Sequence, residues 1–345
     1  MKIVSIVGAR PQFIKLAPIA WQAKGICEHL IVHTGQHYDA SLSDVFFSEL
    51  NIPNPSEVII SGSGTHSEQT ARILIGLEKA LEKLKPDKVI VYGDTNSTLA
   101  GALCASKMKI KVGHIEAGLR SFNKSMPEEI NRVISDHISD LLFAPTVSAM
   151  NNLDREGLSG KSLLVGDLML ELLNHFKSKL EGFGANKKIK RIFCTIHRAE
   201  NTDSPARLSE IIEKLSKSKL PVDLYAHPRL LYKSKQFGIE LAKGQINVKN
   251  PLSYFKAIKL VKNYVGVITD SGGLQKEAYF LSTPCLTVRN ETEWPETLNN
   301  NWNRLDPSLS YVVRNWWILP DEKPVLSEYG DGNSSIKILE ALMNN

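Results

Sequence analysis

Short apolar runs alternate with longer amphipathic stretches through most of the chain. The runs at residues 3–7 and 89–92 are almost continuously apolar, whereas residues 67–85 repeat apolar positions at helical spacing. Continuous apolar strands are typical of parallel sheets with both faces covered by helices. The pattern therefore predicts an α/β fold built from doubly wound sheets.

The same alternation continues to the end of the chain. We expect further strands at residues 29–33, 112–115, 141–143, 191–195, 222–226, 265–269 and 285–288. We expect further helices from residue 13 onward and at residues 42–50, 98–108, 127–139, 207–217, 254–262 and 273–280.

A basic connection that contains glycine separates two such series. Residues 177–191 carry six basic residues, one acidic residue and two glycines. The whole chain has 345 residues, and domains average about 150 residues. We therefore predict two Rossmann-like domains, residues 1–168 and 169–332, with the ligand in a cleft that faces the carboxyl ends of both sheets.

Composition and charge narrow the class of ligand. Hydrophobic residues make up 42%, and 42 basic against 37 acidic residues leave a net charge of +5. This small excess is spread along the chain and falls short of a nucleic-acid-binding signature. It suits a pocket for an anionic ligand, so we predict no nucleic-acid partner.

Cysteine usage and the first residues indicate a cellular location. Cys27, Cys104, Cys194 and Cys285 are widely separated, which argues against a disulfide framework or a zinc site. The first apolar run is too short for a secretory signal, and no run approaches the roughly 18 apolar residues of a membrane span. We expect reduced thiols in a soluble, cytoplasmic protein that makes no membrane contact.

Two loops that follow predicted strands have features of phosphate sites. Gly8 permits a tight turn, Pro11 suits a first helical turn, and Arg10 and Lys15 lie near the same helix start. In the second series, residues 269–274 read TDSGGL, where exposed backbone amides and the Ser271 hydroxyl suit a phosphate. Each loop alone has an ordinary structural reading, but two together point to a diphosphate.

Acidic and histidine side chains follow other strands. Asp94 and Glu116 each come after a strand of the first series, and His197 and His227 do so in the second. Groups of this kind at strand ends act as general acids or bases when their surroundings shift their pKa. Any one of them is more often a cap or a surface ion pair, but the recurrence favours a catalytic cleft.

Other kinds of site are absent from the sequence. The GxGxxG, Walker, GxSxG and HExxH patterns do not occur in the required context. Asp94 and Asp270 could recruit a metal in principle, but they come from different predicted domains. We therefore predict no nicotinamide, no other cofactor and no metal.

The strand-end motifs, taken in order, closely resemble those of the non-hydrolysing UDP-N-acetylglucosamine 2-epimerase family. They are GARPQFIK, TGQHYD, VYGDTNSTLAG, HIEAGLRSFN, MPEEINR, TIHRAENTD, HPR, TDSGGLQKEA and VRNETEWPE, and they cover nearly the whole chain. The resemblance implies a GT-B-like pair of Rossmann-like domains, a final helix at residues 333–345 that crosses back to the first domain, and a homodimer.

The resemblance also implies roles for individual residues. The family's essential acids and base correspond to Asp94, Glu116, Glu128 and His197. Contacts to the UDP moiety correspond to Arg10, Lys15, Arg132, Arg198, His227, Ser271, Gly272, Gly273 and Glu277, while Gln36 and His37 correspond to regulatory or sugar contacts.

Three departures from the family pattern suggest the substrate. Members that act on plain UDP-N-acetylglucosamine usually begin GTRPE and carry a longer segment before PEE, whereas this chain has GARPQ, SFNKSMPEE and a TEW triplet. This looks more like the branch that epimerises UDP-2,3-diacetamido-2,3-dideoxyglucuronate for surface polysaccharides. Such an isomerase would eliminate UDP to a glycal intermediate and add it back.

Four alternatives stay open from the sequence. The chain could epimerise UDP-N-acetylglucosamine itself, or hydrolyse its substrate during epimerisation. It could also be a GT-B glycosyltransferase, or a sensor that binds a nucleotide sugar without turnover. The paired carboxylates after adjacent strands make the transferase less favoured.

Overall fold

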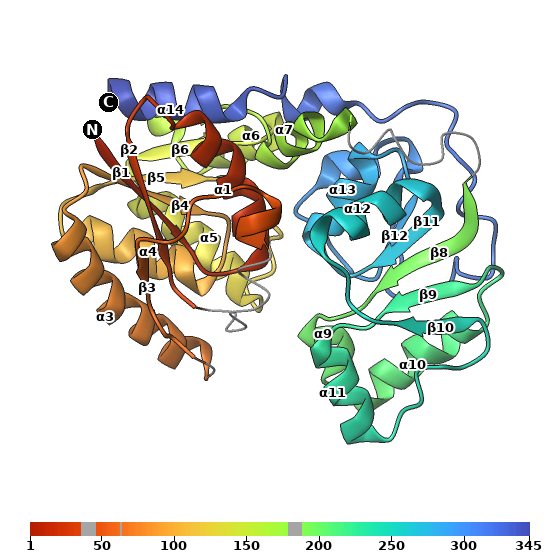
Figure 1. The fold of residues 1–345 in the computed structure, drawn as a ribbon. Coiled ribbons are helices and arrows are strands. Elements are labelled where there is room, and N and C mark those ends of the chain that lie inside the picture. The colour runs from red at the N-terminus through yellow and green to blue at the C-terminus, as the bar shows by residue number, and fades with distance from the viewer. Residues whose placement is uncertain (36–45, 63, 179–187) are drawn as a thin grey trace. The chain divides into compact units, whose positions relative to one another are not determined.

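The computed structural model describes residues 1–35, 46–62, 64–178 and 188–345. Two compact units make up the chain (Figure 1). The first comprises Met1–Phe176 with Ser327–Asn345, and the second comprises Lys177–Leu326. Each contains its own parallel sheet and is described separately.

A parallel sheet forms the centre of the first unit. Its strand order is β3-β2-β1-β4-β5-β6-β7, so the order reverses between β1 and β4. The strands are β1 (Lys2–Val7), β2 (Glu28–His33), β3 (Glu57–Val58), β4 (Lys88–Tyr92), β5 (Lys111–Ile115), β6 (Leu141–Ala144) and β7 (Ser162–Leu164).

Helices cover this sheet and explain its apolar strands. They are α1 (Arg10–Gln22), α3 (His66–Leu84), α4 (Asn96–Lys107), α5 (Pro127–Ile138), α6 (Val147–Arg155), α7 (Leu168–His175), α14 (Ser334–Asn344) and the 3₁₀ turn η1 (Ser159–Lys161). Val4, Ile6, Val89 and Val91 are fully buried in one hydrophobic cluster with residues of α3 and α4. Burial on both faces is why these strands lack polar alternation.

The second unit repeats the design with the order β10-β9-β8-β11-β12-β13. Its strands are β8 (Ile189–Thr195), β9 (Val222–Tyr225), β10 (Ile246–Lys249), β11 (Tyr264–Thr269), β12 (Cys285–Thr287) and β13 (Asn303–Leu305). Its helices are α9 (Ala199–Thr202), α10 (Pro205–Ser216), α11 (Pro228–Phe237), α12 (Tyr254–Asn263), α13 (Gly272–Phe280) and the 3₁₀ turn η2 (Pro295–Asn301). A further 3₁₀ turn, η3 (Leu326–Tyr329), precedes α14.

Two hydrophobic clusters sandwich the second sheet. Ile192 and Leu224 lie in one cluster with residues of α10, whereas Phe193 and Val267 lie in the other with residues of α12 and α13. Trp316 packs directly against Gly266 of β11, where a Cβ atom would lie 2.6 Å from its ring. Both units are therefore doubly wound, which confirms the predicted fold class of two Rossmann-like domains.

Helix caps explain where two predicted helices begin. Helix α3 begins at His66 because the Thr65 hydroxyl caps it, not at the predicted residue 67. Helix α4 begins at Asn96, after the Thr95 cap. The predicted helix at 42–50 lies partly outside the described residues.

The first unit extends past the predicted division at residue 168. Helix α7 belongs to it because α7 packs on α1, and the Trp21 ring lies 4.5 Å from that of His175. The last helix, α14, also packs on α1 and α7, and the Glu171 carboxylate accepts a hydrogen bond from the Ser335 amide at 2.9 Å. The hydrophobic run LMLELL therefore completes the first core, and the connection begins only after it.

All four cysteines are free thiols. Burial raises the pKa of Cys104 to about 11 and that of Cys285 to about 12, so both stay protonated near neutral pH. Among the described residues, no helix combines the length and apolar character needed to cross a bilayer.

Candidate functional site

The carboxyl ends of the strands carry the candidate residues of the first unit. Arg10 and Lys15 lie on α1 after β1, Asp94 follows β4, and Glu116 follows β5. The sheet order reverses between β1 and β4, which is where doubly wound folds bind their ligands. The topology therefore gathers residues that are far apart in the sequence at one edge of the sheet.

Lys15 and Glu116 form a buried ion pair at this edge. Both side chains are 9% exposed, and they line a small cavity with Pro145, Gly166 and other residues of the first unit. Gly93 lies directly against the pair, since a Cβ atom there would be 3.1 Å from Glu116 Oε2 and 3.3 Å from Lys15 Nζ. A carboxylate and an ammonium are thus held together beside a hollow.

The backbone at Glu116 is strained. Its φ of +69° lies in the left-handed region, which is unfavourable for a residue with a side chain. The amides of Glu116 and Ala117 both donate to the Phe143 carbonyl at 3.1 Å, which holds the turn. Strain of this kind is retained where the surrounding structure determines it, often at functional positions.

Arg132 joins two carboxylates on the other side of the β4 turn. Its guanidinium donates to Asp94 Oδ2 at 2.6 Å and to Glu129 Oε2 at 2.7 Å. The Asp94 side chain is 30% exposed, so its carboxylate still reaches solvent beside a buried cation. The structure therefore brings Asp94 and Arg132 together.

Glu128 and Glu129 differ sharply although both lie in the first turn of α5. Glu129 is buried and accepts hydrogen bonds from the amides of Ser121 and Phe122 and from Arg132. Glu128 is half-exposed and makes no hydrogen bond or ion pair within the described part of the chain. Glu128 is therefore the member of this pair that is available to a ligand, while Glu129 fixes the loop before the helix.

Gln12 is a buried residue at the candidate site to which sequence analysis assigned no role. Its carbonyl oxygen accepts from the amides of Gly8 and Ala9, and its amide donates to the Tyr92 carbonyl at 2.8 Å and to the Thr95 hydroxyl at 3.0 Å. It therefore ties the turn after β1 to the turn that carries Asp94. The departure from the usual GTRPE motif was the available signal.

Three further candidates of the first unit, Arg10, Gln36 and His37, have few or no described contacts. Arg10 is exposed at the start of α1, with its guanidinium 4.8 Å above the Phe46 ring. Gln36 and His37 lie outside the described residues, so their predicted regulatory or sugar contacts stay predictions.

Asp270 organises the strand ends of the second unit. It is fully buried and accepts hydrogen bonds from the His197 amide at 3.0 Å, the Arg198 amide at 2.9 Å and the Asn201 side chain at 3.1 Å. His197 Nδ1 lies 3.2 Å from Asp270 Oδ1. A saturated carboxylate of this kind orients the imidazole and its backbone, and is not an open metal ligand.

Ser271, Gly272 and Gly273 form the beginning of α13. The Ser271 hydroxyl caps the helix by accepting from the Leu274 amide at 3.3 Å. The backbone amides at such a helix start favour an anion. Glu277 lies one turn further along and is buried, and His227 caps α11 with its ring 5.4 Å from that of His197.

A buried arginine–glutamate pair lies beside this helix start. Arg289 donates to both carboxylate oxygens of Glu293, at 2.7 and 2.9 Å, and Arg198 Nη2 lies 3.9 Å from Glu293. A Cβ atom on Gly272 would lie 3.8 Å from Arg289 Nη1. The VRNETEWPE motif was the signal for these residues, although sequence analysis assigned them no role.

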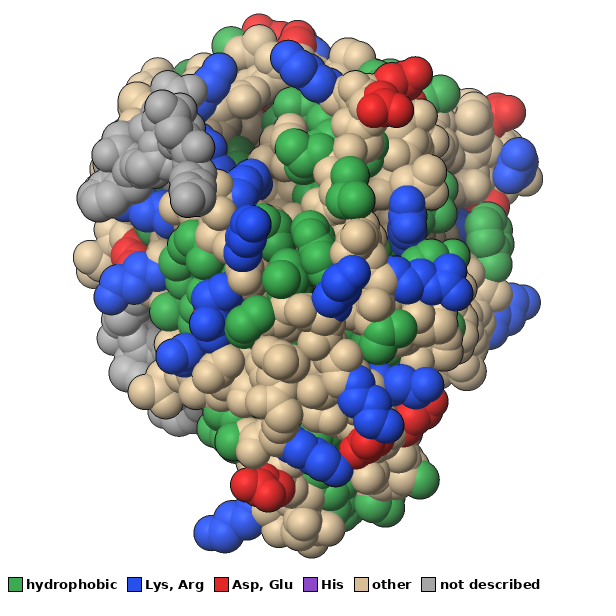
Figure 2. Space-filling view, turned by 90° about the vertical axis from the view of Figure 1, so that its right-hand side faces the viewer, with side chains coloured by type: hydrophobic (Ala, Val, Ile, Leu, Met, Phe, Trp, Pro, Cys, Tyr) green, Lys and Arg blue, Asp and Glu red, His purple; other side chains and the backbone are tan. Residues whose placement is uncertain are grey.

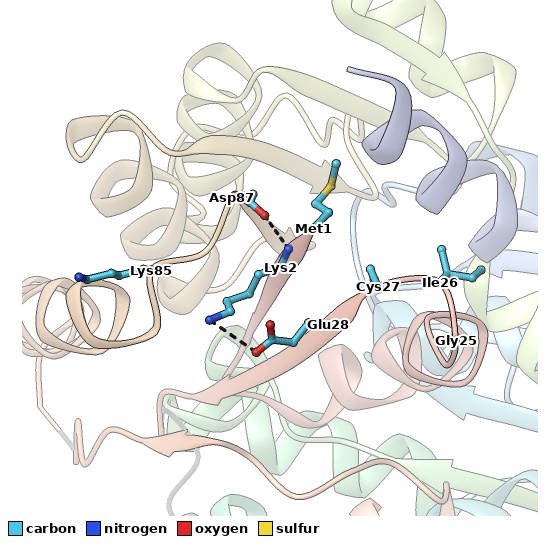
Figure 3. A pocket seen from close by; sticks show the side chains of 8 residues that line it. All are labelled: Met1, Lys2, Gly25, Ile26, Cys27, Glu28, Lys85 and Asp87. Carbon is cyan, nitrogen blue, oxygen red and sulfur yellow. Dashed lines mark hydrogen bonds and ion pairs between the residues drawn. The ribbon is translucent and has the colours of Figure 1, made fainter.

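Nothing in the described ranges forms a metal site, since no group of three or more His, Cys, Asp or Glu side chains is placed to hold an ion. A pocket lined by Met1, Lys2 and Cys27 among others lies at the opposite end of the first sheet (Figure 3). There the Lys2 amide donates to Asp87 Oδ2 at 2.7 Å, and the Lys2 ammonium lies 3.5 Å from the Glu28 carboxylate. The pocket contains no candidate residue. Figure 2 shows Lys and Arg side chains scattered among hydrophobic ones, rather than in one continuous strip.

The two units therefore carry two sets of candidates. In the first, Lys15 pairs with Glu116 and Asp94 pairs with Arg132, whereas Glu128 makes no hydrogen bond or ion pair with either pair in the described structure. In the second, Asp270 gathers His197 and Arg198 beside the α13 start. Both sets contain cations and helix starts that suit an anion, together with groups able to move a proton.

Comparison with known proteins identifies the family. The profile of the family described as UDP-N-acetylglucosamine 2-epimerase matches residues 20–343. A UDP-N-acetylglucosamine 2-epimerase homolog of Methanococcus maripaludis is 47% identical, with both chains fully covered. The UDP-2,3-diacetamido-2,3-dideoxy-D-glucuronate 2-epimerase of Pseudomonas aeruginosa is 42% identical over 99% of each chain.

The fold agrees with this family. The crystal structure of Methanocaldococcus jannaschii UDP-GlcNAc 2-epimerase in complex with UDP-GlcNAc and UDP has a TM-score of 0.91, with 39% identity and full coverage of both chains. The resemblance carried by the strand-end motifs is thereby confirmed, as is the prediction of an isomerase. This chain belongs to the UDP-N-acetylglucosamine 2-epimerase family.

Proposed function

We propose that this enzyme inverts carbon 2 of UDP-2,3-diacetamido-2,3-dideoxyglucuronate to give the mannuronate epimer, without net hydrolysis. The observation that supports this choice of substrate is the 42% identity, over 99% of both chains, to the P. aeruginosa UDP-2,3-diacetamido-2,3-dideoxy-D-glucuronate 2-epimerase. Surface-polysaccharide synthesis is the process that this product would supply.

The GARPQ motif, one of the departures on which the substrate prediction rests, places Gln12 beside the turn that bears Asp94. The Gln12 amide donates to Tyr92 and Thr95 at the turn that bears Asp94. A glutamate, as in the GTRPE motif, would have no proton to donate when ionised. Glutamine in place of glutamate at position 12 therefore allows hydrogen bonds to the turn that bears Asp94. It also removes a negative charge from the turn after β1.

UDP-N-acetylglucosamine is the second candidate substrate. It is favoured by the M. jannaschii structure, whose chain matches this one over its full length at 39% identity. The two substrates differ at carbons 3 and 6, whereas the chemistry at carbons 1 and 2 is common to both. The mechanism below therefore applies to either sugar.

Departure of UDP is the first chemical step that we propose. The C1–O bond to the diphosphate breaks while a base removes the carbon 2 proton, which forms the C1=C2 bond of a glycal. Arg10, Lys15, Arg198 and the amides at Ser271–Gly273 would stabilise the negative charge that develops on UDP. Helix starts and fixed cations are suited to this because they need little reorganisation.

Return of UDP completes the inversion. An acid delivers a proton to the opposite face of carbon 2, and the diphosphate oxygen bonds again to carbon 1. Asp94, Glu116, Glu128 and His197 are the groups that we propose for the two proton transfers. The Lys15 ammonium lies beside the Glu116 carboxylate, and Asp270 orients His197.

We further propose that the enzyme needs no metal or other cofactor and works as a homodimer. Protein cations supply the charge stabilisation that a metal would otherwise give to the diphosphate. Sedimentation velocity tests the dimer, and assays after exhaustive chelation test the metal independence. A monomer, or loss of turnover on chelation, would remove these parts of the proposal.

Product analysis tests the substrate and the absence of hydrolysis together. The purified enzyme is incubated separately with each UDP-sugar, and nucleotides are resolved by anion-exchange chromatography. We expect an epimeric UDP-sugar from the diacetamido-glucuronate, with much less free UDP than epimer. Turnover of UDP-N-acetylglucosamine alone would select the second candidate, and free UDP formed at the rate of epimerisation would indicate a hydrolysing enzyme.

A further inference from the structure

Asp136 is a fully buried carboxylate on α5 with no role in the chemistry proposed above. Its Oδ1 atom lies 2.7 Å from His114 Nδ1, and its Oδ2 atom accepts from the Gly118 amide at 3.1 Å and lies 2.7 Å from Arg120 Nη1. Three partners on one buried carboxylate form an ordered network.

This network reaches the turn that carries Asp94. The second ring nitrogen of His114, Nε2, lies 2.7 Å from the Gly93 carbonyl oxygen. The Gly93 amide donates in turn to the Ile115 carbonyl at 2.9 Å. His114 therefore connects Asp136 to the backbone immediately before Asp94.

The network also reaches the turn that carries Glu116. Gly118 and Arg120 follow Glu116 by two and four residues, and both bond to Asp136 Oδ2. Arg120 is held from its other side by the Glu156 carboxylate, through two contacts of 2.7 Å. The left-handed backbone at Glu116 is thus fixed from the residues that follow it.

Helix α5 acts on the Asp94 turn at two points. Arg132 and Asp136 are four residues apart, so they project from the same face of the helix. Arg132 binds the Asp94 carboxylate directly, while Asp136 acts on the Gly93 carbonyl through His114. One rigid element thereby fixes both the side chain and the backbone of this turn.

The ionisation of Asp136 and the hydrogen bonds of the His114 ring are consistent with this network. Burial raises the pKa of Asp136, but the charges and hydrogen bonds of His114 and Arg120 outweigh burial and leave that pKa below its ordinary value. The ionised carboxylate is an acceptor only, and so is the Gly93 carbonyl. Both His114 contacts are hydrogen bonds only when each ring nitrogen carries a proton.

We propose that Asp136 is a positioning residue that, through His114 and Gly118, sets the placement of both Asp94 and Glu116 for proton transfer. The role of the two carboxylates rests on the proposed function, whereas the network itself does not. Asp136 touches no substrate in this account and acts only through the backbone of the two turns.

Steady-state kinetics of Asp136 variants test the role. Asp136→Ala removes every bond to the network, and we expect kcat to fall about 10- to 100-fold because small displacements of reacting groups cost that much. KM should change less than about threefold, since the proposed diphosphate contacts lie elsewhere. Asp136→Asn should recover most of kcat, because its oxygen can accept from the Gly118 amide and its NH2 group can donate to a His114 ring that has given up its Nδ1 proton.

The matched control is Asp140→Ala. Asp140 accepts from the Val112 amide at 2.8 Å, so it also joins the end of α5 to β5, but near the opposite end of that strand. We expect kcat within about twofold of the wild type. If Asp136→Ala does not fold, His114→Phe keeps an aromatic ring and the Asp136–Arg120 pair while removing both ring nitrogens, and it should lower kcat in the same way.

The outcomes separate this proposal from the proposed function. A folded Asp136→Ala or His114→Phe enzyme with wild-type kcat overturns the positioning role, as does an equal loss in Asp140→Ala. A wild-type enzyme that epimerises neither sugar overturns the proposed function instead. In that case, nitrogen-15 NMR of the His114 ring still tests the network: two N–H signals in the wild type support it, and one contradicts it.

Discussion

Gly93 is where backbone conformation and the candidate chemistry meet most closely. Its φ is +64°, and a Cβ atom would lie 3.1 Å from Glu116 Oε2 and 3.3 Å from Lys15 Nζ. Gly157 has a similar φ of +74°, but nothing lies within 4 Å of its Cβ position. Comparing substitutions at the two glycines therefore distinguishes backbone strain from crowding of the Lys15–Glu116 ion pair.

We expect Gly93→Ala and Gly157→Ala to lower the free energy of unfolding by a similar amount, about 1 kcal/mol, because both place a side chain in the left-handed region. Only Gly93→Ala should lower kcat, by about tenfold or more, because its methyl group displaces Glu116 and Lys15. Urea unfolding and kinetics of both variants provide the test. Equal kcat values would show that the ion pair tolerates displacement.

Glu116→Gln tests the carboxylate itself. We expect turnover to fall by about 10²- to 10⁴-fold, the usual contribution of a general acid or base. UDP should still bind in isothermal titration calorimetry, because the diphosphate cations remain. Glu82→Gln, at an exposed position of α3, is the control and should leave turnover unchanged. Near-normal turnover in Glu116→Gln would remove its assigned role.

At the scale of elements, helix starts carry both stability and binding. Ser271 caps α13 and Ser204 caps α10, with amide-to-hydroxyl distances of 3.3 and 3.4 Å. The first start lies among candidate residues, and the second does not. Comparing Ser271 with Ser204 therefore distinguishes the effect of losing a helix cap from the effect of losing a phosphate-binding group.

We expect Ser271→Ala and Ser204→Ala each to reduce the free energy of unfolding by about 1 kcal/mol through loss of the cap. Only Ser271→Ala should weaken UDP binding, by about tenfold, because a hydrogen bond to a charged group is lost. Thermal unfolding and calorimetry with UDP measure the two effects. Unchanged UDP affinity in Ser271→Ala would exclude its hydroxyl from the phosphate site.

Helices and strands were predictable from the sequence where burial decides them. The apolar runs of β1, β4, β8 and β11 report burial on both sheet faces, so each was found within about two residues. Caps shifted the starts of α3 and α4, because a threonine hydroxyl outside the apolar pattern fixes them. Helix α7 was missed because its packing partner is α1, more than a hundred residues away in the chain.

Candidate site residues could be proposed from the residue pattern mainly where they follow a strand end. Asp94, Glu116 and His197 follow strands directly, so topology alone suggested them. Gln12 and Asp136 lie within helices, and their proposed roles come from bonds to distant turns. Arg289 follows β12 as Asp94 follows β4, and it bonds to Glu293 four residues later. No local pattern distinguishes a buried glutamine that ties two turns from a surface one.

At the scale of the whole molecule, stability should depend on pH through His29 of the first unit. Burial lowers the pKa of His29 from 6.5 to about 4. Between these values the unfolded chain binds a proton that the folded chain does not, so stability is lost as pH falls from 6.5 to 4. The loss amounts to about 3 kcal/mol.

Urea unfolding followed by hydrogen exchange in β1 and β2 measures this loss in the first unit. His29→Gln should flatten the pH dependence between pH 6.5 and 4.5, since the amide does not titrate and can still bond the Ser5 hydroxyl. His137→Gln, at an exposed position, is the control. Parallel curves for the wild type and His29→Gln would show that His29 does not govern acid stability.

The central claim is reversible removal of the carbon 2 proton from a UDP-sugar that stays a UDP-sugar. Proton NMR in deuterated water, with UDP-2,3-diacetamido-2,3-dideoxyglucuronate and UDP-N-acetylglucosamine in separate tubes, tests it most directly. We predict a new manno anomeric signal and deuterium at carbon 2 in the first tube. Epimer that retains its original proton, or no change in either tube while UDP still binds, would contradict the claim.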